Sequence, residues 1–162
     1  DAALIALPYE MTGLSWAHVS DDELLAAAPA DHPIASGAQI APAALETADL
    51  ILLEDGHCLR DQALSFCNLR RVDNIDTFGA SNLSTIVQMV ANGLGMTLLP
   101  ELSIKLECRH DDIRLMRFTD PQPRRVVGLA WRKSSPRKSH FAELGKLITA
   151  ATSGQMLASE AV

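Results

Sequence analysis

Cysteine is scarce in this sequence, and its scarcity limits the chemistry that the chain can use. Only Cys58, Cys67 and Cys108 occur among 162 residues. An odd and sparse set of cysteines is not the disulfide framework of a small secreted protein. A reducing cytoplasm fits better, because a disulfide formed there is transient and regulatory. We therefore expect a cytoplasmic protein and ask whether its cysteines are redox partners.

Long apolar runs and clusters of positive charge are lacking as well. No stretch approaches the roughly 18 apolar residues that span a bilayer, and no basic segment precedes the apolar run at 2–7, so no membrane partner is expected. The 20 acidic residues outnumber the 14 basic ones, which gives a formal net charge of −6. Binding to nucleic-acid phosphates needs a clustered positive face. We therefore do not expect this chain itself to bind DNA.

The apolar residues that are present alternate between strand-like and helix-like patterns, which predicts an α/β architecture. Strands are expected at 2–7, 14–19, 49–53, 96–99, 113–118 and 126–131. Helices are expected at 57–67, 82–91, 100–107 and from about 139, where Phe141, Leu144, Leu147 and Ile148 should face inward. Residues 22–28 are ambiguous, because Leu and Ala favour a helix whereas the turn at 31–33 suits the end of a strand.

The helix expected at 57–67 places Cys58 on its first turn. The unpaired N–H groups there create a positive end. This field, with His57 and Arg60 beside it, favours the thiolate, which is the form that attacks the O–O bond of a peroxide. Asp61 lies three residues on and faces the same side, so its carboxylate could accept a proton.

Cys67 lies nine residues after Cys58. At about 1.5 Å of rise per residue the two positions are about 13 Å apart along the axis, and they point to opposite sides. A disulfide needs Cα atoms within roughly 4.4–6.8 Å. If the two cysteines are redox partners, the helix must therefore unwind and release Cys67 from its buried apolar face. In an arbitrary chain, cysteines at such positions are more often inert core residues, so spacing alone indicates no more than a candidate redox thiol.

Three stretches resemble the peroxide-sensing LysR-type transcription regulators. The run 53–67, LEDGHCLRDQALSFC, is similar to their redox segment, including the cysteine spacing. The stretch 89–100, MVANGLGMTLLP, is similar to the helix–turn–strand of LysR-type effector domains. The stretch 123–129, PRRVVGL, resembles the strand that returns from the second lobe to the first. The likeness covers nearly the whole chain and fades after about residue 150.

The resemblance implies a role for each candidate site residue. Cys58 would be the peroxidatic cysteine and Cys67 the resolving one, and the two would form a disulfide. His57, Asp61 and Arg125 would line the peroxide pocket. No cofactor or metal is implied. The expected partners are hydrogen peroxide, a cellular thiol reductant, further copies of the regulator, and promoter DNA through a helix-turn-helix domain that this chain does not contain.

The resemblance also implies a fold of two α/β lobes like a periplasmic binding protein, with residues 22–28 as a strand. The second lobe would be roughly complete at 9–128. Only parts of the first lobe would be present, at 1–8 and 129–150, and 151–162 would form a frayed tail. The chain thus resembles a fragment of a regulator.

Three other functions remain as alternatives. A LysR-type domain could bind a small organic effector and carry incidental cysteines. A thiol peroxidase would begin with the same chemistry, but the sequence has no Cys-x-x-Cys or other resolving centre that would support turnover. A metal site is not expected, because Cys58, Cys108 and their neighbouring histidines lack the paired spacing of structural zinc sites.

Overall fold

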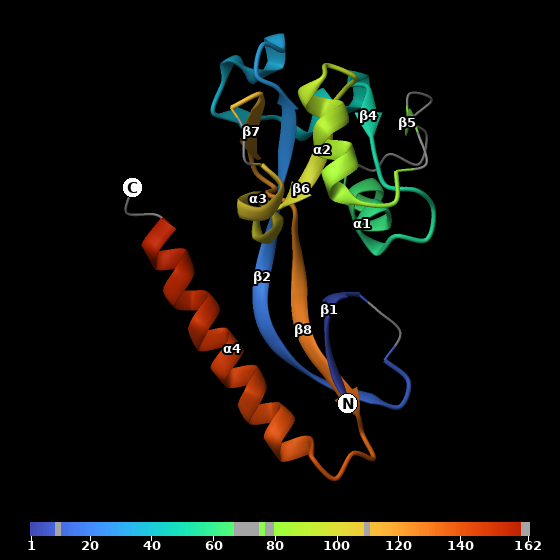
Figure 1. Ribbon diagram of the computed structural model, residues 1–162, viewed down its shortest axis with the longest axis vertical. Helices are drawn as coiled ribbons and strands as arrows, with labels where there is room; N and C mark the ends of the chain where they lie inside the picture. Colours follow the sequence, from blue (N-terminus) through green and yellow to red (C-terminus); the bar gives the residue numbers. More distant parts are fainter. Residues whose placement is uncertain (9–10, 67–74, 77–79, 109–110, 160–162) are drawn as a thin grey trace. The chain divides into compact units, whose positions relative to one another are not determined.

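The computed structural model describes residues 1–8, 11–66, 75–76, 80–108 and 111–159 (Figure 1). The backbone divides into two compact units. The first unit comprises residues 1–22 and 124–162, and the second comprises residues 23–123. These boundaries differ from those of the expected lobes, so the lobe assignment stays a prediction. Among the described residues, no helix has both the length and the apolar character needed to cross a bilayer.

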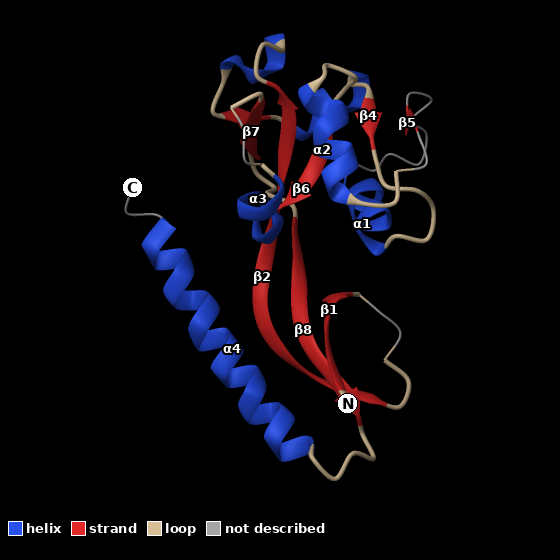
Figure 2. Cartoon of the chain, in the orientation of Figure 1, coloured by secondary structure: helices blue, strands red, loops and turns tan. Residues whose placement is uncertain are grey.

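Strands and helices alternate through the second unit, as the sequence pattern predicts (Figure 2). The described strands are β1 (Ala2–Leu7), β2 (Leu14–Pro29), β3 (Gln39–Ile40), β4 (Leu50–Ile51), β5 (Ile75–Asp76), β6 (Thr97–Pro100), β7 (Ile113–Phe118) and β8 (Arg124–Arg132). The described helices are α1 (Cys58–Phe66), α2 (Leu83–Ala91), α3 (Glu101–Glu107) and α4 (Lys138–Ser159), with short 3-10 turns η1 (Pro33–Ser36) and η2 (Pro42–Thr47).

The first unit is built on β1, β8 and the beginning of β2. Strands β1 and β8 pair antiparallel, with Ala2 opposite Trp131 and Leu7 opposite Val126. Helix α4 packs Phe141 and Ile148 against a core that includes Trp131. The rings of Trp131 and Phe141 have their centroids 6.1 Å apart. These apolar contacts hold α4 against the strands.

The inward face of α4 differs from the predicted one. Phe141 and Ile148 pack inward as predicted, but Leu144 and Leu147 are 42% and 68% exposed. Gly145 takes the inward position instead, where an added Cβ would lie 3.3 Å from the Cβ of Ala17. The prediction was wrong because leucines and small residues both recur at helical spacing, and the backbone approaches the sheet along the small residues. The helix also continues to Ser159, where the sequence suggested a frayed tail.

The second unit is built around the end of β2. Residues Leu24–Ala27 pair antiparallel with β6, and Ala26–Pro29 pair antiparallel with β7. Ala26 and Ala28 face one core cluster, whereas Ala27 faces another, and all three are fully buried. Two bonded edges and two covered faces therefore outweigh the helix propensity of alanine, and the strand at 22–28 is confirmed.

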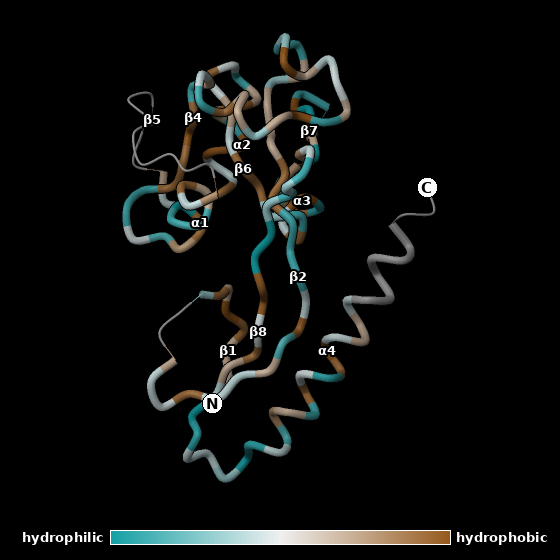
Figure 3. Tube along the Cα trace, turned by 180° about the vertical axis from the view of Figure 1, so that it is seen from behind, coloured by the Kyte–Doolittle hydropathy of each residue, from teal (hydrophilic) through white to brown (hydrophobic). Residues whose placement is uncertain are grey.

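Strand β4 positions the segment that carries Cys58. It is apolar (Figure 3), and Leu50–Leu53 are buried. The N–H of Ile51 donates to the carbonyl of Met96 at 2.8 Å, and the N–H of Met96 donates to the carbonyl of Asp49 at 2.8 Å. The chain leaves this core after Leu53 and turns at Gly56 into α1.

Candidate functional site

Cys58 is the first residue of α1 and is exposed. Gly56 adopts a φ of +94°, a conformation that side chains other than glycine's rarely allow, and so turns the chain into the helix. The carbonyl of His57 accepts hydrogen bonds from the N–H groups of Arg60 and Asp61 at 3.0 and 3.4 Å. The predicted position of Cys58 on the first turn is thus confirmed. Its exposure allows a small oxidant to reach the sulfur.

The body of α1 packs on the core by the predicted stripe. Leu59 is 7% exposed and Ala63 is 2% exposed. Phe66 is half-buried and contacts Phe118 edge-to-face, with ring centroids 5.3 Å apart. These contacts hold the helix in its wound form. Cys67, the predicted resolving cysteine, lies outside the described residues.

Two polar neighbours of Cys58, His57 and Arg60, have partners of their own. His57 Nε2 lies 3.8 Å from Glu54 Oε1. Arg60 Nε lies 2.9 Å from Asp55 Oδ1, and Arg60 Nη1 donates to the carbonyl of Leu53 at 3.1 Å. Asp61 is exposed on the first turn of α1. His57 and Asp61 lie beside Cys58 along the chain, and their place in a peroxide pocket stays a prediction.

Arg125, the third predicted pocket residue, lies in the first unit. Its Nε and Nη2 both contact Asp22 Oδ2 at 2.8 Å. The side chain of Asp22 is fully buried, and that of Arg125 is 17% exposed. The sequence analysis did not single out Asp22. Its neighbours Asp21 and Glu23 are also acidic, so nothing in the sequence marks Asp22 as the buried one.

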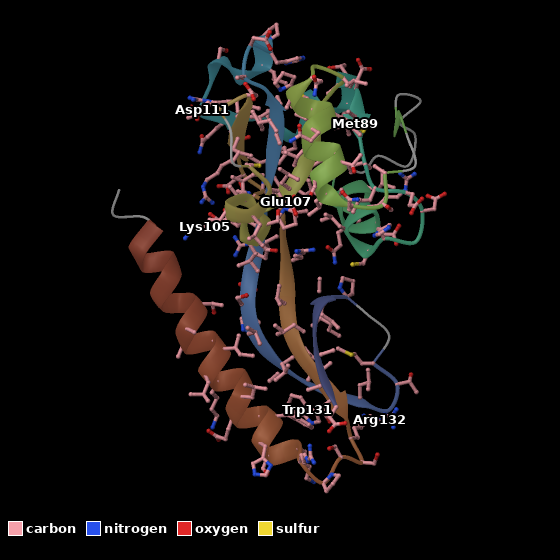
Figure 4. The ribbon with its side chains drawn as sticks, viewed as in Figure 1. Met89, Lys105, Glu107, Asp111, Trp131 and Arg132 are labelled. Atoms are coloured by element: carbon pink, nitrogen blue, oxygen red, sulfur yellow. The ribbon has the colours of Figure 1, made fainter. Side chains whose placement is uncertain are left out.

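Cys108 directly follows α3 and is half-buried. Burial, and to a smaller degree the charge of Glu107, raises the pKa of its thiol. Glu107 and Lys105 both come from α3 (Figure 4), and Glu107 accepts a hydrogen bond from Ser84 Oγ at 2.6 Å. A raised pKa leaves less thiolate at neutral pH, so Cys108 is a poorer nucleophile than an ordinary cysteine.

A small cavity lies beneath α1, between Leu53, Leu59, Arg60 and Ala63 on one side and residues of α2 and β6 on the other. Its volume is about 10 Å³, which is at the limit for a single water molecule. It is therefore too small for an organic ligand. Among the described residues, no group of three or more His, Cys, Asp or Glu is arranged to hold a metal ion.

Comparison with known proteins finds similarity over nearly the whole length of the chain. Residues 1–153 match the family model of the LysR substrate binding domain. A probable hydrogen peroxide-inducible genes activator from Mycobacterium avium is 40% identical over 161 residues, an alignment covering 99% of this chain and 50% of the relative. The chain therefore spans about half the length of the curated relatives that it matches.

Two solved structures have the same fold. OxyR from Corynebacterium glutamicum, a cysteine-to-serine mutant with bound hydrogen peroxide, gives a TM-score of 0.87 at 33% identity, covering 95% of this chain and 49% of that chain. The reduced OxyR regulatory domain from Pseudomonas aeruginosa gives 0.79 at 35% identity, covering 93% of this chain and 72% of that domain. The predicted α/β effector fold of the periplasmic-binding-protein type is confirmed. The chain belongs to the LysR substrate binding domain family, and the two similar structures in that family are OxyR proteins.

Proposed function

We propose that this chain is the hydrogen-peroxide-sensing regulatory domain of a LysR-type transcription factor. The observation that carries the proposal is the exposed Cys58 on the first turn of α1, in a chain whose relatives are peroxide-responsive activators. Cys58 is the peroxidatic cysteine and Cys67 the resolving one. Reversible thiol chemistry of this kind belongs in a reducing cytoplasm.

The chemistry proceeds in two steps. The Cys58 thiolate attacks one oxygen of hydrogen peroxide, the O–O bond breaks, and Cys58 becomes a sulfenic acid as hydroxide leaves and takes up a proton. The Cys67 thiol then attacks the sulfenic sulfur, an S–S bond forms, and a second water leaves. Two thiols and one peroxide thus give one disulfide and two waters. A cellular thiol reductant reverses the change.

The proposal also covers the peroxide pocket, the structural change on oxidation and the partners of the regulator. His57, Asp61 and Arg125 line the peroxide pocket. Disulfide formation requires α1 to unwind first, because the two cysteines cannot meet across an intact helix. The remodelled domain alters the regulator's assembly with further copies of itself. Promoter DNA is bound by a helix-turn-helix domain elsewhere in the regulator.

The experiment treats the reduced chain with one equivalent of hydrogen peroxide and maps the cysteines by peptide mass spectrometry. We expect the loss of two thiols and a peptide joined through Cys58 and Cys67, with Cys108 still reduced. A Cys58 sulfenic or sulfinic acid beside a free Cys67 contradicts the two-cysteine switch. It leaves sensing by Cys58 alone.

Single substitutions assign the roles. Cys58→Ser should abolish oxidation, whereas Cys67→Ser should leave Cys58 oxidisable but unable to form the disulfide. Cys108→Ser is the matched control and should behave as the unsubstituted chain. Equal loss of the first step in the Cys58 and Cys67 variants contradicts these roles. Continuous peroxide consumption with a dithiol reductant, at the turnover of an enzyme, favours a thiol peroxidase instead.

A further inference from the structure

The side chain of Arg60 bridges the first turn of α1 and the chain that precedes the helix. Its Nη1 donates to the carbonyl of Leu53, where the buried core ends, and its Nε contacts the carboxylate of Asp55. Both partners precede Gly56, whereas Arg60 follows Cys58. We call Arg60 with these two contacts the Arg60 strap. The strap closes a loop that contains Cys58.

The burial of the strap is uneven. The side chain of Arg60 is 12% exposed, whereas that of Asp55 is 92% exposed. Arg60 also lines the small cavity with Leu53, Leu59 and Ala63, so its aliphatic stem lies among apolar side chains. The hydrogen bond to the Leu53 carbonyl is partly buried and involves a charged donor, and such bonds are the stronger ones. Opening the first turn of α1 must break these contacts together.

We propose that Arg60 is a positioning residue that holds Cys58 on the first turn of α1 and restrains the helix from unwinding. The role rests on the proposed function, in which α1 unwinds before Cys58 meets Cys67. Arg60 acts through the backbone of 53–60. Two nitrogens of the Arg60 side chain contact Leu53 and Asp55. Its main effect is therefore on how easily the first turn of α1 opens, and any effect of its charge on the sulfur is smaller.

The substitution Arg60→Lys separates the two effects. It keeps the positive charge, but its single ammonium on a flexible stem does not reproduce the planar donors that reach two acceptors at once. If charge alone matters, Arg60→Lys behaves as the unsubstituted chain and Arg60→Gln does not. If the strap matters, both variants open more easily.

The first measurement is amide hydrogen exchange of the reduced full chain over residues 54–61, which reports local opening. We expect exchange about tenfold faster in Arg60→Lys and Arg60→Gln, the order expected for losing a charge-assisted hydrogen bond. Asp55→Asn removes one contact at an exposed position and should give a smaller increase without affecting the fold. Unchanged exchange in Arg60→Lys overturns the strap.

The second measurement follows the sulfenic acid and the disulfide separately by quenched mass spectrometry after peroxide. In both Arg60 variants the disulfide should form from the sulfenic acid about tenfold faster, because the opening equilibrium shifts by that factor. Formation of the sulfenic acid should change by less than about threefold in Arg60→Lys, which keeps the positive charge beside the sulfur. A loss in the first step that Lys restores and Gln does not assigns Arg60 to charge instead.

The two proposals fail in different ways. Absence of a Cys58–Cys67 disulfide in the unsubstituted chain defeats the proposed function, whereas faster exchange in the variants would still support the strap. A normal disulfide with unchanged exchange and unchanged rates in both variants defeats the strap alone. Arg117→Lys is the matched control, because Arg117 also bridges two acidic groups, Glu23 and Glu101, on other elements.

Discussion

At the scale of single residues, Asp22 shows how a buried charge is accommodated. Its carboxylate is fully buried in β2 and is contacted by two nitrogens of Arg125 on β8. A buried ion without a partner is strongly unfavourable, whereas a paired and hydrogen-bonded one is tolerated. Asp22 and Arg125 are therefore interdependent. A change in either alone removes this ion pair.

We expect Asp22→Asn to lower the free energy of unfolding by about 3 kcal/mol, because Arg125 would remain partly buried without a carboxylate. Urea unfolding followed by circular dichroism measures the loss. The matched control is Glu23→Gln at the next position of the chain. Glu23 is 30% exposed and its partner Arg117 is 48% exposed, so this change should cost less than about 1 kcal/mol. Equal losses in both variants contradict the argument.

At the scale of elements, the contact between β4 and β6 depends on the backbone of the turn after α2. Gly95 has a φ of +154°, and a Cβ added there would lie 2.5 Å from the carbonyl oxygen of Asp49. Gly93 has a φ of +80°, and its added Cβ would meet nothing within 4 Å. At both positions glycine permits a positive φ that other residues rarely adopt. Only at Gly95 does the missing side chain also leave room for the neighbouring backbone of Asp49.

This difference predicts unequal costs for two similar substitutions. Gly93→Ala should lower the free energy of unfolding by about 1 kcal/mol, the cost of a left-handed conformation. Gly95→Ala should cost about 3 kcal/mol or more, because the backbone of Asp49 must also shift. Thermal unfolding of the two variants beside the unsubstituted chain tests the order. A larger loss for Gly93→Ala would show that the close approach is not needed.

Local patterns predicted much of this arrangement, and they were wrong in places where distant contacts decide. The helices that begin at Cys58 and Leu83 are confirmed, because their apolar stripes, and the Asn82 cap of the second, depend on residues a few positions apart. Strand β4 has only two residues, Leu50 and Ile51, of the five expected. An apolar run marks burial, whereas a strand also needs a bonded neighbour.

At the scale of the whole molecule, the net charge of the chain opposes binding to DNA. The chain carries a formal charge of −6 and matches only about half the length of its curated relatives. Duplex DNA repels an acidic chain unless basic residues cluster on one face. We therefore expect this chain by itself not to bind duplex DNA.

We expect the 162-residue chain by itself to show no binding to duplex DNA tighter than about 100 μM at physiological salt, the weak end of non-specific binding. Fluorescence anisotropy of a labelled duplex measures it, and a repeat at low salt serves as the control. Micromolar binding that weakens steeply as salt is added would reveal a basic surface that net charge conceals. Such binding would contradict the expectation that this chain does not bind duplex DNA.

The sequence by itself determined the features that depend on neighbours along the chain: a thiol on the first turn of a helix, the apolar stripe behind it, and the strands bounded by proline and glycine. The tertiary structure alone decided which alanines form a strand, which face of α4 turns inward, that Asp22 meets Arg125, and that Arg60 reaches back to Leu53. Local conformation follows from backbone sterics and side-chain spacing, whereas burial and charge pairing depend on residues brought together from distant parts of the chain.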